Sequence, residues 1–480
     1  MQKILRLLLI LIAHSSFAQS GINWSPPLNI AANSFGNQHP RVVVDASGDP
    51  LVLWGHASNK EAWFSRWNGT AFSTPLNLNA AAIPVFAASW AGPDLAAKGD
   101  TVYVVYKHTP EDTNHIYLVH SYDGGVNFSA PKRVDFIDPF ISRFPAVSTD
   151  AAGNPLVAFM KFDPGFTNAR YVLVRSGDFG NSFTPDVPAS GFSGGYVCDC
   201  CPATVVSSGD KVATLYRDNL NNVRNMWAGI STDGGVTFVE GIQMDETNWV
   251  INSCPSSGPD GVIIGDSLYT VFMSGASGKA LCYVGKASLE SMDAGTSTPL
   301  TGNFAGLASQ NFPRIAGDGA AVAVVWKQQS NNAAQLGLFF TDNISGGFPP
   351  NYDTLSTGSF ANADVYVHAG TIHVVWENLS TGSVTYRKGT YSTTGVSERP
   401  AKVLSLYPNP VVDNRLSVRF DQAGMVSCSV RNSIGQEVLN RVAALENGAL
   451  TLDLPGLPQG VYYLVARSGD SAAVAKFIKQ

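Results

Sequence analysis

The 480-residue sequence has few charged residues, few histidines and no long apolar run in its interior. Lys, Arg, Asp and Glu make up only 14% of the chain, and the formal net charge is −6. No basic stretch offers a surface for nucleic acid or for an anionic membrane, so we expect neither partner. The eight histidines show no metal-ligand spacing such as His-x-x-x-His. No interior segment is long and apolar enough to predict a transmembrane helix.

The first residues have the order of a signal peptide. Lys3 and Arg6 come before a short apolar segment at 7–13. In Ser16-Phe17-Ala18, the small residues Ser16 and Ala18 stand three positions and one position before Gln19. This pattern predicts a signal peptide at 1–18 with cleavage after Ala18. The mature chain would then leave the cytoplasm, where its six cysteines can be oxidised.

An eight-residue motif, Ser-x-Asp-x-Gly-x-x-Phe, occurs three times at one spacing, with each copy beginning 55 residues after the last. The Asp can accept hydrogen bonds from turn N–H groups, the Gly can adopt positive φ, and the Phe can pack beneath the hairpin. The motif resembles the Asp-box, or BNR repeat, of sialidase-like β-propellers, in which it is a folding device far from the active site. The resemblance implies a structural role for Ser121, Asp123, Gly125, Phe128, Ser176, Asp178, Gly180, Phe183, Ser231, Asp233, Gly235 and Phe238.

A longer unit repeats seven times around these motifs, as an extended segment that ends in an apolar, often aromatic, strand. The units begin at Pro40, Pro93, Pro145, Pro202, Pro259, Pro313 and Val365. A fixed period of this size indicates a repeat fold. We therefore predict an all-β protein in which residues 19–395 form a sialidase-like β-propeller of four-stranded blades. Seven units favour seven blades, whereas six blades, as in sialidases, would require one unit to be misassigned.

The two ends of this region are complementary. Residues 22–30 resemble the fourth strand of a blade without its first three strands, while the seventh unit has only three strands and ends near Tyr391. We therefore expect the N-terminal strand to complete the last blade and to close the ring without a covalent link.

A polar linker at 396–402 separates the propeller from a small C-terminal β domain at 403–480. This domain contains Tyr407-Pro408-Asn409-Pro410 and Gly460-Val461-Tyr462 in that order. It resembles the C-terminal sorting domain of the type IX (Por) secretion system, type A. The resemblance implies an Ig-like β-sandwich that contacts the secretion machinery. It also implies export through the periplasm to the medium or the outer-membrane surface. We expect a monomer.

Four arginines near the ends of expected inner strands are weak catalytic candidates: Arg41, Arg143, Arg217 and Arg314. A sialidase needs three arginines to bind a carboxylate, because guanidinium groups bind it bidentately, together with a Tyr–Glu pair and an acidic proton donor. The aromatic-Arg-Ile-Pro signature of that family is missing, and the sequence assigns no Tyr–Glu pair. The alternative is that these arginines hold neighbouring blades together by hydrogen bonds.

Cysteines cluster in two loops that precede consecutive units. Cys198, Cys200 and Cys201, with Asp199 among them, stand before Pro202, and Cys254 occupies the matching place one unit later. Adjacent blades would bring these loops together near the channel mouth. A disulfide from Cys198 or Cys200 to Cys254 would join two blades. Alternatively, the four thiols could hold copper or zinc. Trp249, beside the second loop, is a candidate for stacking a sugar.

Three functions follow from these features. The first, which we favour because no complete catalytic set is visible, is binding of extracellular glycans or other surface ligands on the channel face. The second is an exo-sialidase-type glycoside hydrolase. The third is a metal-binding or redox protein that uses the Cys198–Cys201 and Cys254 cluster. The fold alone does not decide among them, because propellers carry many functions.

Overall fold

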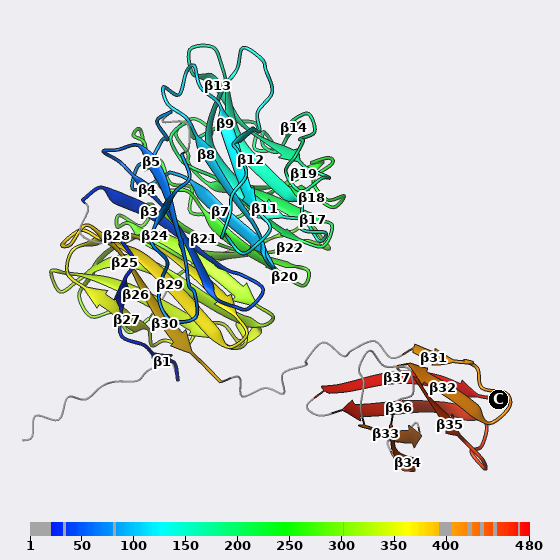
Figure 1. Ribbon diagram of the computed structural model, residues 1–480. Helices are drawn as coiled ribbons and strands as arrows, with labels where there is room; N and C mark the ends of the chain where they lie inside the picture. Colours follow the sequence, from blue (N-terminus) through cyan, green and yellow to red (C-terminus); the bar gives the residue numbers. More distant parts are fainter. Residues whose placement is uncertain are drawn as a thin grey trace, which may run out of the picture. The chain divides into compact units, whose positions relative to one another are not determined.

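The computed structural model describes residues 21–31, 35–79, 83–300, 302–392, 405–419, 425–432, 436–444, 449–468 and 471–480. The signal peptide expected at 1–18 and the linker expected at 396–402 lie outside these residues. The chain divides into two compact units, one ending at Ser392 and the other beginning at residue 393 (Figure 1). Among the described residues, no helix has the length and hydropathy needed to cross a membrane.

The first unit is a closed ring of seven antiparallel sheets. One strand from each sheet contacts the next in the order β3 (Asn37–Val44), β7 (Asp94–Lys98), β11 (Ile141–Thr149), β16 (Thr204–Ser208), β20 (Asp260–Ile264), β24 (Leu307–Asp318) and β28 (Phe360–His368), and β28 contacts β3 again. These are the inner strands. The unit is therefore a seven-bladed β-propeller, which confirms the predicted fold and the larger of the two predicted blade numbers.

The remaining strands run outward in each blade, except β15 (Tyr196–Val197), which pairs with β17 (Lys211–Asn219) on the same side as β16. Second strands are buried almost throughout because both of their faces pack against neighbouring blades, whereas several outermost strands are short and more exposed. Their bounds are β4 (Pro50–His56), β5 (Glu61–Arg66), β6 (Leu76–Asn77), β8 (Thr101–Lys107), β9 (Ile116–Ser121), β10 (Lys132–Arg133), β12 (Pro155–Asp163), β13 (Thr167–Arg175), β14 (Val187–Pro188), β15 (Tyr196–Val197), β17 (Lys211–Asn219), β18 (Met226–Ser231), β19 (Glu240–Gln243), β21 (Ser267–Ser274), β22 (Leu281–Ser288), β23 (Ala294–Pro299), β25 (Ala321–Ser330), β26 (Ala333–Thr341), β27 (Asp353–Thr357), β29 (Thr371–Asn378) and β30 (Ser383–Thr390), with a short 3-10 helix η1 (Ile344–Gly346) before β27.

The N-terminal segment completes the seventh blade. Strands β1 (Asn23–Trp24) and β2 (Leu28–Asn29) both pair with β30 (Figure 1). The Trp24 indole N–H donates to Asp353 Oδ2 at 2.8 Å. Ile22 packs into the core between the sixth and seventh blades. This arrangement confirms the predicted closure of the ring by the N-terminal strand.

The three Asp-box turns share one hydrogen-bond pattern. In the first, Asp123 Oδ1 accepts hydrogen bonds from the Ser121 hydroxyl at 2.7 Å and from the Asn127 N–H at 2.9 Å. Ser121 Oγ accepts from the Gly125 N–H at 2.9 Å. A Cβ atom on Gly125 would lie 2.5 Å from the Phe64 ring of the preceding blade, so glycine permits this close packing. The other two turns repeat these bonds.

The Asp-box turns should make part of the stability of the propeller dependent on pH. Burial raises the pKa of Asp123, but the hydrogen bonds from Asn127, Ser121 and Val126 outweigh it and lower the pKa to about 2. Because this pKa lies below the ordinary value of 3.8, the stabilisation is present above that pH and is lost as the pH falls toward 2. We expect Asp123→Asn to lower the melting temperature by about 2 °C at pH 7. Calorimetry should show this difference shrinking between pH 4 and pH 2, and a constant difference would contradict the assignment.

The second unit is a two-sheet sandwich. One sheet has the order β31 (Ser405–Tyr407), β32 (Arg415–Arg419), β35 (Ala449–Asp453), and the other has the order β34 (Glu437–Ala444), β33 (Met425–Asn432), β36 (Gly460–Ser468), β37 (Ser471–Lys479). Its core is apolar and includes the buried thiol of Cys428. The sandwich agrees with the predicted Ig-like domain.

Candidate functional site

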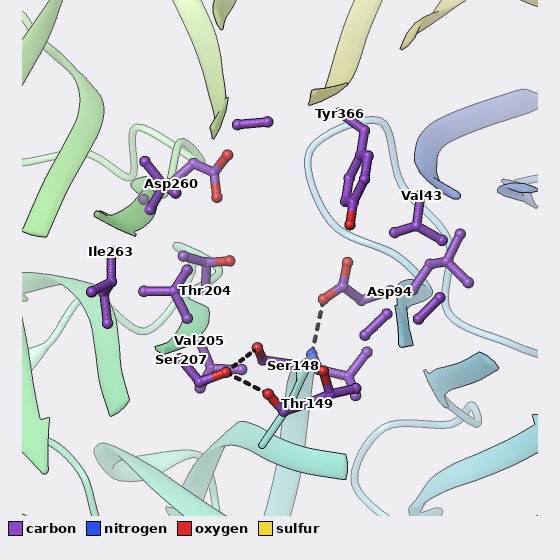
Figure 2. Close-up of a pocket in the computed structure, with 18 of the residues that line it drawn as sticks. Val43, Asp94, Ser148, Thr149, Thr204, Val205, Ser207, Asp260, Ile263 and Tyr366 are labelled. Atoms are coloured by element: carbon purple, nitrogen blue, oxygen red, sulfur yellow. Dashed lines mark hydrogen bonds between the residues drawn. The ribbon is translucent and has the colours of Figure 1, made fainter. Parts of the chain in front are cut away.

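A channel runs through the centre of the propeller. It encloses a cavity of about 510 Å³ that is lined by the inner strands of all seven blades. Side-chain oxygens of Ser148, Thr204, Ser207 and Tyr366 face it (Figure 2). A cavity of this size lies in the range of sites that hold small molecules.

The cavity reaches the ends of the inner strands, where Lys98 and Ser208 lie at hairpin turns. The Asp-box turns are on this side too, because the Gly124 N–H donates to the Asp100 carbonyl of such a hairpin. The cysteine loops instead lead into the starts of inner strands. The ligand-sized cavity runs along the inner strands from their first residues, such as Thr204 and Asp260, to their hairpin ends, and none of the four clustered cysteines lines it.

Five charged side chains form a belt across the channel, which we call the charge belt: Arg41, Asp94, Asp260, Arg314 and Asp364. Arg41 Nε lies 3.2 Å from Asp94 Oδ1. Arg314 Nε lies 2.9 Å from Asp364 Oδ1 and 3.3 Å from Asp260 Oδ2. With two arginines and three aspartates, the belt has a formal charge of −1.

The aspartates of the charge belt also link neighbouring blades. Each accepts a hydrogen bond from a backbone N–H of the next blade, from Val147 to Asp94 at 2.9 Å, from Ile315 to Asp260 at 2.9 Å and from Val42 to Asp364 at 3.0 Å. The belt is therefore both part of the channel wall and a structural tie.

Burial and neighbouring charges set the protonation of this region. Burial lowers the pKa of Arg314, but Asp260 and Asp364 outweigh it, so the pKa rises well above its usual value. Burial, assisted by Arg41 and Arg314, holds the pKa of His39 well below its ordinary value. His39 is therefore neutral at pH 7, and its Nε2 accepts a hydrogen bond from Arg41 Nη2 at 2.7 Å.

The four arginine candidates do not converge. Only Arg41 and Arg314 line the same cavity. Arg143 pairs with the Glu111 carboxylate at 2.8 Å. Arg217 is fully buried, and its guanidinium donates to the backbone carbonyls of Ser257, Arg224 and Met273. These contacts fit the alternative in which the arginines hold blades and loops together.

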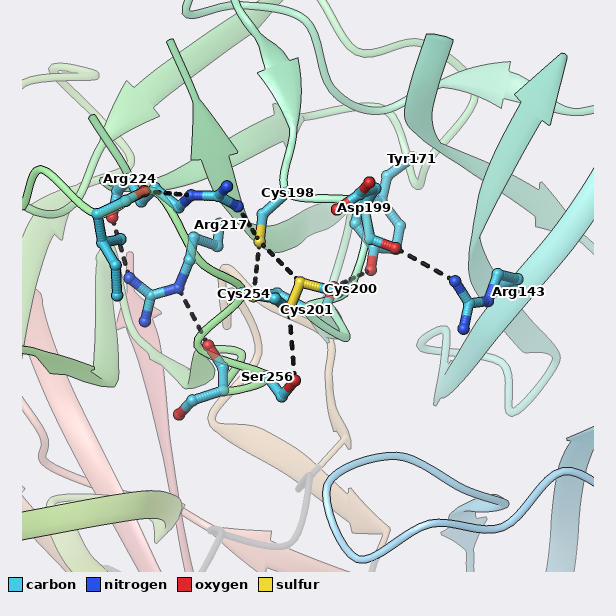
Figure 3. Close-up of a disulfide and its surroundings, with 12 residues drawn as sticks. Arg143, Tyr171, Cys198, Asp199, Cys200, Cys201, Arg217, Arg224, Cys254 and Ser256 are labelled. Atoms are coloured by element: carbon cyan, nitrogen blue, oxygen red, sulfur yellow. Dashed lines mark hydrogen bonds between the residues drawn. A yellow bond between two sulfur atoms is a disulfide. The ribbon is translucent and has the colours of Figure 1, made fainter. Parts of the chain in front are cut away.

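The cysteine cluster joins two loops of neighbouring blades. The sulfurs of Cys198, Cys200, Cys201 and Cys254 all lie within 4.8 Å of one another (Figure 3). Cys200 and Cys254 form a disulfide with a Cα–Cα distance of 6.2 Å, which is one of the pairings left open by the sequence. Cys198 and Cys201 are buried free thiols. The disulfide therefore fastens the loop before β16 to the loop before β20.

The sulfur spacing favours disulfide chemistry over a shared metal ion. Tetrahedral zinc with Zn–S bonds of about 2.3 Å would hold its sulfurs about 3.8 Å apart. The Cys198 and Cys201 sulfurs are only 2.8 Å apart, and Cys200 is already bonded to Cys254. The arrangement in the structure thus does not fit the copper or zinc site considered from the sequence.

The indole ring of Trp249 packs against Gly275 and lies near the Arg217 guanidinium. A Cβ atom on Gly275 would lie 2.8 Å from the indole, and the Arg217 guanidinium lies 5.4 Å from the ring centre. Its use as a platform for a sugar stays a prediction.

Several residues of the channel were not found from the sequence, among them Asp94, Asp260, Asp364 and Tyr366. Pro93-Asp94 and Pro259-Asp260 are the same dipeptide at the same place in two repeat units. This repetition was the available signal for the charge belt. No comparable signal marks Tyr366.

The propeller and the C-terminal sandwich are the two compact units of the chain. Residues 405–480 match the family described as "Secretion system C-terminal sorting domain". The chain therefore carries the predicted type IX sorting domain, which indicates export to the cell surface or the medium through contact with the type IX machinery.

Known structures with similar folds are distant. A protein of unknown function from Dyadobacter fermentans is 12% identical, with 78% of this chain and 100% of that chain covered and a TM-score of 0.46. An α-L-arabinanase from Penicillium chrysogenum is 12% identical over 77% and 98% of the two chains, with a TM-score of 0.41. A Trypanosoma rangeli sialidase is 11% identical over 95% and 88%, with a TM-score of 0.42. No curated protein matches the chain.

Proposed function

We propose that this exported propeller binds an extracellular glycan in its central channel. The observation that supports the proposal is the 510 Å³ cavity with its polar lining, which offers hydroxyl groups, charged groups and one aromatic ring to a bound molecule. Saccharides are recognised by this combination of directional hydrogen bonds and an apolar ring face.

The charges favour a neutral saccharide over an acidic one. The charge belt carries a formal charge of −1, and both of its arginines are already paired with carboxylates. A carboxylate-bearing sugar such as sialic acid would have to displace these pairs and approach three aspartates, which is unfavourable in a partly desolvated site.

Tyr366 allows a conservative test of the channel. Its ring lines the cavity, and among the described residues its hydroxyl forms no hydrogen bond with a protein group. Tyr366→Phe removes that hydroxyl and leaves the ring in place. If the hydroxyl bonds to a ligand, affinity should fall about 3- to 10-fold, the effect of one neutral hydrogen bond.

The measurement is a glycan array with the full chain, followed by calorimetric titration of the best neutral glycan. Tyr117→Phe, on β9 and outside the channel lining, is the matched control and should bind like the wild type. Failure to bind any neutral glycan, or an equal loss in both variants, would overturn the proposal. Hydrolysis of a sialoside by the wild type would favour the glycosidase hypothesis instead.

A further inference from the structure

Two buried arginines lie beside the free thiols: Arg217 interacts electrostatically with the buried carboxyl of Asp245 without forming an ion pair, and Arg224 contacts a thiol directly. Arg224 is 7% exposed, and its Nη1 donates to the Cys198 sulfur at 2.9 Å (Figure 3). Among the described residues, neither Arg224 nor Arg217 forms an ion pair with a carboxylate. A buried cation is strongly favoured by an anionic partner. A thiolate on Cys198 supplies that partner.

The disulfide beside this thiol is open to solvent. The Cys198 sulfur lies 3.6 Å from the Cys200 sulfur, and Cys254, the other half of the disulfide, is exposed. The Cys201 sulfur lies on the other side of Cys198, at 2.8 Å. Cys198 is therefore placed between a resolving thiol and a disulfide, which is the order that thiol–disulfide exchange requires.

We propose that the four cysteines are a thiol–disulfide exchange centre that passes two electrons between the buried Cys198–Cys201 pair and a dithiol or disulfide on another exported molecule, by way of exposed Cys254. This activity is separate from glycan binding and does not depend on it.

The internal exchange balances without an added oxidant. The Cys198 thiolate attacks the Cys200 sulfur, so that the Cys198–Cys200 bond forms and the Cys200–Cys254 bond breaks, leaving a thiolate on Cys254. The Cys201 thiol, losing its proton, then attacks Cys198 and releases Cys200. Cys198 and Cys201 are oxidised by two electrons, Cys200 and Cys254 are reduced by two, and two protons move to the new thiols.

The second part of the exchange uses the partner. The Cys254 thiolate attacks the partner disulfide, forms a mixed disulfide and releases one partner thiolate. Cys200 then attacks Cys254, restores the Cys200–Cys254 bond and releases the second partner thiolate. The net result is reduction of the partner disulfide and oxidation of the Cys198–Cys201 pair. The same steps in reverse oxidise a dithiol of the partner and reduce a Cys198–Cys201 disulfide by the same two electrons.

The local charges favour the reverse direction, in which a Cys198–Cys201 disulfide is reduced and a dithiol of the partner is oxidised. The hydrogen bond from Cys201 and the charges of Arg224 and Arg217 lower the pKa of Cys198 against the effect of burial. Burial raises the pKa of Cys201 well above its ordinary value. Because Arg224 stabilises the thiolate and not the disulfide, it makes a Cys198–Cys201 bond easier to reduce.

The test is a redox titration of the full chain in glutathione buffers, with thiols trapped by N-ethylmaleimide and located by mass spectrometry. We expect the species with one disulfide to contain two isomers, Cys200–Cys254 and Cys198–Cys201. Arg224→Gln should favour the Cys198–Cys201 disulfide at least tenfold, which corresponds to about 30 mV. Cys198→Ser should remove the second isomer and abolish reduction of the disulfide probe DTNB by the form of the chain that retains the Cys200–Cys254 disulfide, because only Cys198 can open that disulfide under native conditions.

Cys282→Ser is the control, because Cys282 is fully buried in another core and should affect neither readout. The proposal is overturned if only Cys200–Cys254 is ever trapped, or if Cys198 and Cys201 react only when Cys282 does, on unfolding. It is equally overturned if added zinc or copper binds stoichiometrically and protects all four thiols, since these would then be metal ligands. The arginine variant retains all four sulfurs, so it tests the mechanism even if Cys198→Ser folds poorly.

Discussion

Replacing Arg314 with methionine should destabilise the propeller by about 3–5 kcal/mol, the cost of leaving buried charges without a partner. Arg314 is paired with both Asp260 and Asp364, and the two carboxylates are 7% and 8% exposed. Because these aspartates also accept backbone bonds from neighbouring blades, the loss should spread across two blade interfaces. Urea unfolding at pH 7, followed by fluorescence, measures the change in the free energy of unfolding.

Arg170→Met is the matched control, because Arg170 forms a more exposed pair with Asp163, in which both side chains are 33% exposed. Such a solvent-screened pair contributes little to stability, so its loss should cost far less than the loss of Arg314. Adding Asp364→Asn to Arg314→Met should recover part of the loss, since it removes one uncompensated charge. Equal effects of Arg314→Met and Arg170→Met would show that the charge belt does not hold the blades together.

Removal of residues 21–31, with residues 1–20 kept, should open the ring. The deletion takes away β1 and β2, which pair with the outer edge of β30, together with the buried side chains of Ile22 and Ile30. Burial of these two isoleucines alone contributes about 3–6 kcal/mol. The deletion also leaves the outer edge of β30 unpaired, and an unpaired edge strand can pair with a strand of another chain. We expect a large fall in melting temperature and soluble oligomers on gel filtration.

Two point variants distinguish the loss of packing that closes the ring from a general effect of changing the N-terminal segment. Ile22→Ala should cost about 2–4 kcal/mol because the side chain is buried at 7% exposure. Leu28→Ala, at 42% exposure in the same segment, should cost less than about 0.5 kcal/mol. A monomeric deletion variant with the melting temperature of the wild type would contradict the closure.

The fold was readable from the sequence because a propeller repeats its local chemistry. Each Asp-box is complete within eight residues, and the prolines mark the start of the inner strands, so the blade number and the closing strand could be predicted. Ion pairs between side chains of different blades could not be predicted in this way. Arg314 meets Asp260 and Asp364 at separations of 54 and 50 residues, and nothing local to either residue indicates that contact.

The same limit applies to the cysteines and to the channel. The sequence placed two cysteine loops side by side but left open whether Cys198 or Cys200 pairs with Cys254, because that choice depends on where each Cβ points. The position of Tyr366 in the channel lining depends on strand register, since a shift of one residue would turn its side chain to the other face.

Hydrogen exchange of the full chain, with and without the best neutral glycan from the array, tests the channel site most directly. If the glycan binds in the cavity, amides at the hairpin ends of the inner strands, near 98–101, 149–154 and 207–211, should be protected, because the cavity extends to Lys98, Asp150 and Ser208. The same protection should weaken in Tyr366→Phe at equal glycan concentration. Protection confined to the cysteine loops at 196–203 and 249–258, or no protection at saturating glycan, would contradict a ligand site in the channel.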